Sequence, residues 1–63
     1  MKPRLGEIRK SKGLEQKYVA NKIGIGFQRL SDWERGKGMP RYDKAYSLAK
    51  IYGVTMEELY EEE

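Results

Sequence analysis

Apolar residues recur three and four positions apart along most of this chain, a spacing that places them on one face of a helix. In the first half the pattern predicts three short helices, the second over about residues 16–23 and the third over 27–35. Gly13 and Gly24 follow the first two helices, where glycine takes the left-handed conformation that ends a helix. No stretch alternates as a strand would. The apolar positions are, in chain order, Leu5 and Ile8; Val19, Ala20 and Ile23; and Leu30 and Trp33.

Two more helices are expected beyond the glycines and proline of residues 36–40. The fourth runs from about residue 42 to 52. The fifth is short, ends on Leu59 and begins with a capping box, because Thr55 and Glu58 have the spacing at which each side chain accepts from the other residue's amide. The pattern therefore predicts an all-α, compact five-helix fold. Apolar positions of the fourth helix are Ala45, Leu48, Ala49 and Tyr52.

The joint between the second and third helices is the most informative feature. Two helices of about eight residues joined by a tight glycine turn form a helix-turn-helix, here from Gln16 to Glu34. Ala20 lies where the helices would cross, and its small side chain lets the backbones approach. In such a unit the second helix crosses the DNA backbone and the third enters the major groove. The same spacing also occurs in helical bundles that never touch DNA.

Composition narrows the possible functions. With 63 residues we expect one domain, 1–63, with its core between residues 4 and 60 and an acidic tail from 61 to 63. The chain has no cysteine and no histidine, which removes disulfides, thiolate metal sites and the commonest general base. Only scattered carboxylates remain, so we expect no enzyme activity, metal or cofactor. Because no signal peptide or long apolar run is visible, a cytoplasmic location is expected.

Charge is divided unevenly along the chain. All 13 Lys and Arg residues lie between Lys2 and Lys50 with only five acids, giving this part a net charge of +8. The last ten residues carry five glutamates and no base, which brings the total to +3. A basic body with an acidic end suits a polyanionic partner such as DNA. A well-solvated surface would also look like this.

These residues resemble the Cro/repressor-type (XRE-like) helix-turn-helix family from about Leu5 to Leu59. The resemblance implies a lambda-repressor-like fold and a repressor-like transcriptional regulator. Such a regulator is expected to bind double-stranded DNA at a palindromic operator as a homodimer. No small-molecule ligand is expected. Glu15 and Gly26 depart from the family, which usually has a serine or threonine cap at both places. The matching residues are Arg9, Gly13-Leu14-Glu15-Gln16, Val19-Ala20, Ile23-Gly24-Ile25, Leu30-Ser31-Asp32-Trp33-Glu34-Arg35-Gly36, Pro40, Leu48-Ala49 and Gly53-Val54-Thr55.

The exposed face of the third helix is expected to read bases. Gln28 suits a bidentate contact with adenine, and Phe27 suits a thymine methyl group. Asp32 could accept from cytosine if Arg29 or Arg35 screens its charge. Trp33 is expected in the core. The base-reading candidates are Phe27, Gln28, Ser31 and Asp32.

Other residues are expected to hold the DNA backbone or the scaffold. Gln16 matches the family's phosphate-binding glutamine at a helix N-terminus. Arg9 and Glu34 match a partly buried ion pair that ties the first helix to the end of the third. The backbone-contacting candidates are Gln16, Lys17, Arg29, Arg35, Lys37 and Arg41.

An alternative function uses the same fold as a protein-interaction module, of antitoxin or coactivator type. Tyrosine is enriched at interfaces, and four tyrosines are expected at the surface. A homodimer is expected to use the fourth and fifth helices. The expected exposed tyrosines are Tyr18, Tyr42, Tyr46 and Tyr60, and the expected dimer residues are Tyr46, Ile51, Met56, Leu59 and Tyr60.

Overall fold

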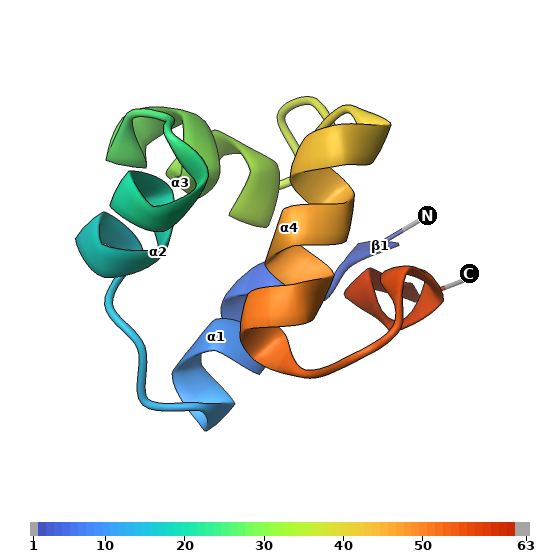
Figure 1. Ribbon diagram of the computed structural model, residues 1–63. Coiled ribbons are helices and arrows are strands. Elements are labelled where there is room, and N and C mark those ends of the chain that lie inside the picture. The colour runs from blue at the N-terminus through green and yellow to red at the C-terminus, as the bar shows by residue number, and fades with distance from the viewer. Residues whose placement is uncertain (1, 62–63) are drawn as a thin grey trace.

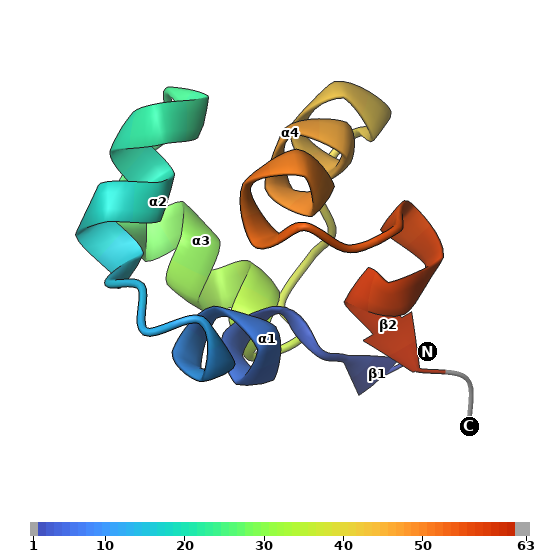
Figure 2. The ribbon, with the colours of Figure 1, turned by 60° about the horizontal axis from the view of Figure 1, so that its bottom comes forward.

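The structure is a computed structural model that describes residues 2–61. Helices α2 and α3 lie together on one side, α4 and the C-terminal segment on the other, and α1 lies beneath them (Figure 1). Both ends of the described chain meet on the side away from α2 and α3 (Figure 2). The elements are β1 (Lys2–Pro3), α1 (Leu5–Ser11), α2 (Gln16–Ile23), α3 (Phe27–Glu34), α4 (Tyr42–Tyr52), the 3-10 helix η1 (Met56–Leu59) and β2 (Tyr60–Glu61).

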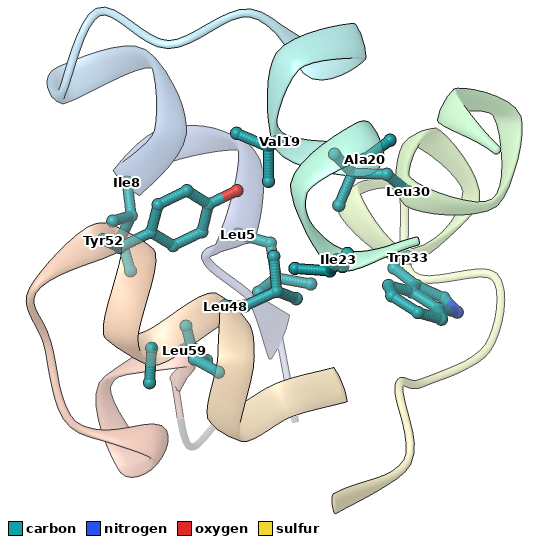
Figure 3. Close-up of a cluster of buried hydrophobic side chains, with 11 residues drawn as sticks. Leu5, Ile8, Val19, Ala20, Ile23, Leu30, Trp33, Leu48, Tyr52 and Leu59 are labelled. Atoms are coloured by element: carbon teal, nitrogen blue, oxygen red, sulfur yellow. The ribbon is translucent and has the colours of Figure 1, made fainter. Parts of the chain in front are cut away.

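The core lies where the four α-helices and η1 converge, and every one of them contributes a buried side chain (Figure 3). Leu5, Leu30 and Leu48 are completely buried and come from three different helices. Burying one such leucine stabilises the fold by about 1.5–3 kcal/mol. The helical spacing of apolar residues therefore correctly identified the core-facing side of each helix. The buried apolar residues are Leu5, Ile8, Val19, Ala20, Ile23, Leu30, Trp33, Leu48, Ala49, Tyr52 and Leu59.

The prediction of five helices is wrong in its last element. Within residues 2–61 there are four α-helices, and the expected fifth is the single 3-10 turn η1. Its capping box is present: the Glu58 amide donates to the Thr55 hydroxyl, and the Thr55 amide donates to the Glu58 carboxylate. The turn goes no further because Tyr60 is already extended, with φ −132° and ψ 147°.

A two-stranded antiparallel sheet, which the sequence did not predict, joins the two ends of the described chain. Lys2 lies opposite Glu61, and Pro3 lies opposite Tyr60. Strands of two residues are too short to show alternation, so no periodicity could reveal them. Glu61, expected in an acidic tail, belongs to β2, and residues 62–63 of that tail lie outside the described residues.

Two residues expected at the surface are more buried than predicted. Leu59 is completely buried in the core, so it is unavailable to a dimer surface. Tyr60 is half-buried, because β2 holds its ring against the core and leaves its hydroxyl buried with no hydrogen-bond partner among residues 2–61. Tyr18, Tyr42 and Tyr46 are exposed, as expected. No helix between residues 2 and 61 combines the length and apolar character needed to cross a bilayer.

Candidate nucleic-acid interface

The turn between α2 and α3 is set by Gly24, which has the left-handed φ of +75°. The Ile25 amide then donates back to the Ala20 carbonyl at 3.0 Å, which satisfies an acceptor at the end of α2. Ala20 is buried, as the close crossing of the two helices requires. The predicted helix-turn-helix is therefore confirmed, with α2 and α3 each eight residues long.

Lys44 adds a contact to this unit that sequence reasoning missed. Its Nζ reaches from α4 and donates to the Ile23 carbonyl at 2.8 Å. A cation at a helix C-terminus complements the partial negative charge of the exposed carbonyls. Because the two residues are 21 positions apart, no local pattern could have indicated the contact. It fixes the end of α2 to α4.

A buried polar network centred on Glu34 ties α1 and α2 to α3. The Arg9 guanidinium donates to both Glu34 oxygens, at 2.7 and 3.2 Å. Arg9 also donates to the Leu14 carbonyl at 2.8 Å, and Gln16 Nε2 donates to Glu34 Oε1 at 2.8 Å. The side chains of Arg9 and Glu34 are only 10% and 8% exposed. The hydrogen bond to Glu34 raises the pKa of Arg9, so the arginine stays charged.

Gly6 makes room for this network. A Cβ atom at position 6 would lie 3.1 Å from Glu34 Oε1 and 3.3 Å from its Cδ, both tighter than ordinary packing. The Glu34 carboxylate can therefore approach the α1 backbone only because residue 6 has no side chain. Nothing in the helical pattern of α1 marks position 6, so its role emerges only from the three-dimensional contact.

The four base-reading candidates lie at different depths on α3. Phe27 and Gln28 are exposed, whereas Ser31 and Asp32 are half-buried. Gln28 and Asp32 line the same open hollow, together with Arg29 and five other residues from the α2–α3 turn, α3 and the segment after α3. Phe27 faces a separate hollow beside the start of α2. The structure thus brings Gln28 and Asp32 together and sets Phe27 apart from them.

Two of the candidate residues pair with each other. Arg35 donates to the Asp32 carboxylate at 2.6 Å, and both side chains are about half exposed. The Asp32 charge is therefore screened by Arg35, the condition under which it could face DNA. Surface pairs of this kind contribute at most about 1 kcal/mol, so the pair can open when a phosphate or a base competes for either partner.

The cationic candidates surround α3 on both sides. Lys17 lies over the Phe27 ring, with Nζ 5.5 Å from the ring centre, beside Gln16 in the hollow at the start of α2. Lys37 lines the hollow that contains Gln28. Arg41 lines a third hollow between α3 and the start of α4. Arg29 lines both this third hollow and the hollow that contains Gln28 and Lys37. The candidate reading face is therefore flanked by positive charge.

With this geometry established, the chain is found to match a family model described as helix-turn-helix over residues 5–59. The chain belongs to that family, and its Cro/repressor-type character is confirmed together with its class as a DNA-binding transcription-regulation domain. The predicted family, the position of the helix-turn-helix and the general function therefore agree.

Individual relatives come from several bacteria. The HTH-type transcriptional regulator DdrOP3 of Deinococcus deserti is 41% identical over 58 residues, covering 92% of this chain and 45% of the relative. The CTXphi transcriptional repressor RstR of Vibrio cholerae is 36% identical, covering 89% and 50%. The HTH-type transcriptional activator BcrR of Enterococcus faecalis is 32% identical, covering 89% and 28%. This chain spans half or less of the length of these relatives.

Proposed function

We propose that this chain binds double-stranded DNA sequence-specifically as part of a transcriptional regulator, with α3 in the major groove. The observation that carries the proposal is the placement of Gln28 on an open hollow flanked by Arg29 and Lys37, on a helix whose far end is anchored by the buried Arg9–Glu34 pair. An amide can read a base edge, while the cations hold phosphates on either side. Because the Arg9–Glu34 pair anchors α3, the Gln28 amide and the flanking cations keep fixed positions relative to the duplex.

The backbone contacts in this proposal come from the two flanks of α3. On one flank Gln16 and Lys17 lie at the first turn of α2, whose free backbone amides also favour an anion. On the other flank Lys37 and Arg41 lie on the segment between α3 and α4, and Arg35 joins them with its remaining N–H groups while its pairing with Asp32 screens that carboxylate. Ser31 and Asp32 complete the reading face beside Gln28, and Phe27 extends it from the separate hollow at the start of α2. Phosphate contacts position the helix, and the α3 side chains then select the sequence.

We further propose that two copies act together on a palindromic site, because one module of this size covers only half a site. The surface offered to the partner is the hollow between α4 and η1, which includes the exposed ring of Tyr46 and the half-buried Met56. Leu59 has no part in it. The names of the relatives include both a repressor and an activator, so they do not favour either role. We propose a repressor role because the sequence resembles the Cro/repressor-type family.

Binding to duplex DNA over a range of salt concentrations tests the proposal. The logarithm of the affinity should fall linearly with the logarithm of salt concentration, by about 0.9 for each phosphate contact. Selection from a random duplex pool should then enrich one sequence motif. Absence of binding to duplex DNA at low salt would reject the proposal.

A protein-interaction module remains the second candidate, favoured by the hollow between α4 and η1. Tyr42, Tyr46 and Met56 line it with Ala49 and Val54, and Tyr42 is 77% exposed. Tyrosine and methionine are both enriched in protein interfaces. Under this alternative, the natural chain would show no detectable duplex binding, and Tyr46→Ala would abolish its binding to a partner protein. Under the DNA proposal, the same variant weakens dimer formation but leaves contacts of a single copy with DNA in place.

A further inference from the structure

Trp33 is a core residue that nevertheless carries an unused hydrogen-bond donor. The residue is 7% exposed, yet no oxygen within residues 2–61 accepts a hydrogen bond from its indole Nε1. Figure 3 shows this nitrogen on the edge of the ring that faces away from the other labelled side chains. It also differs from the hydroxyls of Tyr52 and Tyr60, which are sealed from solvent. The indole N–H therefore reaches the surface with no partner in the described part of the chain.

Trp33 lies between two of the hollows beside α3. One hollow, of about 670 Å³, is lined by Gln28 and Lys37 among others, and the second, of about 430 Å³, by Met39 and Arg41. Trp33 and Arg29 are the residues common to both linings. The same indole therefore borders the hollow that contains the reading face and the hollow beside the start of α4.

Gly38 keeps this edge of the indole uncovered. Its φ of +100° is a conformation that residues with side chains rarely adopt, and a Cβ there would lie 3.9 Å from Trp33 Cδ1. Cδ1 is the ring atom bonded to Nε1. The loop after α3 thus passes close to the donor edge without placing a side chain over it.

The surroundings of the second hollow favour an anion. Arg29 and Arg41 contribute positive charge there, and neither is paired with a carboxylate within residues 2–61. Asp43 is the one acidic residue of the lining, whereas the Lys44 ammonium is already directed to the Ile23 carbonyl. Arg41 precedes α4 without capping it through its side chain, so the first amides of that helix also lack a side-chain acceptor. The unpaired charges of Arg29 and Arg41 therefore favour an acceptor ligand in this hollow, beside the unpartnered indole N–H.

We propose that the Trp33 indole N–H donates a hydrogen bond to a phosphate oxygen of the DNA backbone, with Arg29 and Arg41 supplying the charge. This inference rests on the proposed DNA-binding function and adds to it a contact made by a residue that sequence analysis placed only in the core. Because the donor is neutral and the acceptor is a phosphate, the contact strengthens binding to every sequence alike and adds no counterion release.

The test replaces only the N–H group. Trp33 is the one tryptophan of the chain, so chemical synthesis with 3-benzothienylalanine at position 33 exchanges the N–H for a sulfur atom of similar shape. We expect the affinity for a mixed-sequence duplex of about 30 base pairs to fall about tenfold, the usual effect of losing a hydrogen bond to a charged acceptor. The dependence of affinity on salt should keep its slope, and thermal unfolding of the free chain should be unchanged.

Arg41→Gln is the matched variant, because it removes a charge from the same hollow. It should weaken binding and also reduce the salt slope by about 0.9, which the analogue should not do. In the unmodified chain, the single indole N–H resonance should shift and become protected from solvent exchange when duplex is added. An analogue that binds as tightly as the natural chain, or an indole N–H unaffected by duplex, would overturn the inference. If the natural chain itself does not bind duplex at low salt, the proposed function fails.

Discussion

Gln16 Nε2 donates a 2.8 Å hydrogen bond to Glu34 Oε1, the carboxylate that also receives the Arg9 guanidinium. The side chain proposed to hold a phosphate at the start of α2 is therefore oriented by the end of α3. One amide hydrogen of Gln16 is used by Glu34, and the second stays available to an acceptor outside the protein. The ion pair thus links the stability of the fold to the geometry of its proposed DNA contact.

Glu34→Gln should destabilise the chain by about 3–5 kcal/mol, because it leaves the buried Arg9 guanidinium without its counter-charge. Urea unfolding followed by circular dichroism measures this loss. The control is Glu7→Gln, which breaks the exposed pair between Arg4 and Glu7. That pair is largely solvated, so its loss should cost no more than about 1 kcal/mol. Equal effects of the two substitutions would show that burial does not strengthen the Arg9–Glu34 pair.

Gly6→Ala should destabilise the chain even though alanine favours helix by about 1 kcal/mol over glycine. The new methyl group would lie 3.1 Å from Glu34 Oε1, and the hydrogen bonds from Arg9 and Gln16 restrain that carboxylate from moving away. The measurement is the midpoint of thermal unfolding. Lys10→Ala on the exposed side of α1 serves as the control and should change the midpoint little. A higher midpoint for Gly6→Ala would contradict the close contact.

Stability should fall at alkaline pH because of Tyr52. Burial, followed by the nearby charge of Glu34, raises the pKa of Tyr52 from 10.0 to about 12. The folded state therefore holds the phenolic proton more tightly than the unfolded state. The resulting stabilisation is complete below pH 10 and is lost as the pH rises from 10 to 12, at up to about 1.4 kcal/mol per pH unit.

Tyr52→Phe isolates this effect, since the buried hydroxyl has no hydrogen-bond partner within residues 2–61. Unfolding free energies measured from pH 8 to pH 11.5 should decline less steeply in this variant than in the natural chain. Tyr42→Phe is the matched control, because Tyr42 is 77% exposed and its substitution should leave the pH dependence unchanged. Parallel curves for the natural chain and Tyr52→Phe would rule out Tyr52 as the source.

Much of the fold could be predicted from short-range patterns. The end of α2 at Gly24 could be predicted because this glycine comes directly after the apolar pattern of the helix. The capping box of Thr55 and Glu58 spans only three positions. Contacts between distant residues left no such signal. Lys44 meets Ile23 across 21 positions, and Pro3 meets Tyr60 across almost the whole chain.

The candidate site shows the same division. Residues on one face of α3 could be selected from helical spacing alone. Their depths could not, because burial depends on how distant segments pack around the helix, and Ser31 and Asp32 are half-buried. The Arg9–Glu34 pair was suggested by resemblance to a family rather than by spacing. That Gln16 would join the pair could not be seen, because its amide orientation depends on where the end of α3 lies in space.

Gln28→Ala and Lys37→Ala should have different effects on DNA binding. Both residues line the same hollow, but Gln28 carries an amide suited to a base edge and Lys37 a charge suited to phosphate. Loss of the amide should cost about 1–3 kcal/mol on the preferred sequence and much less on others, which relaxes specificity. Loss of the lysine should weaken all duplexes alike and reduce the salt slope by about 0.9. The effects of the two variants are separated by measuring affinities for the selected motif and for a scrambled duplex, each at several salt concentrations. Equal loss of specificity in both variants would reject the assignment of α3's reading face, while general DNA binding by the chain would stand.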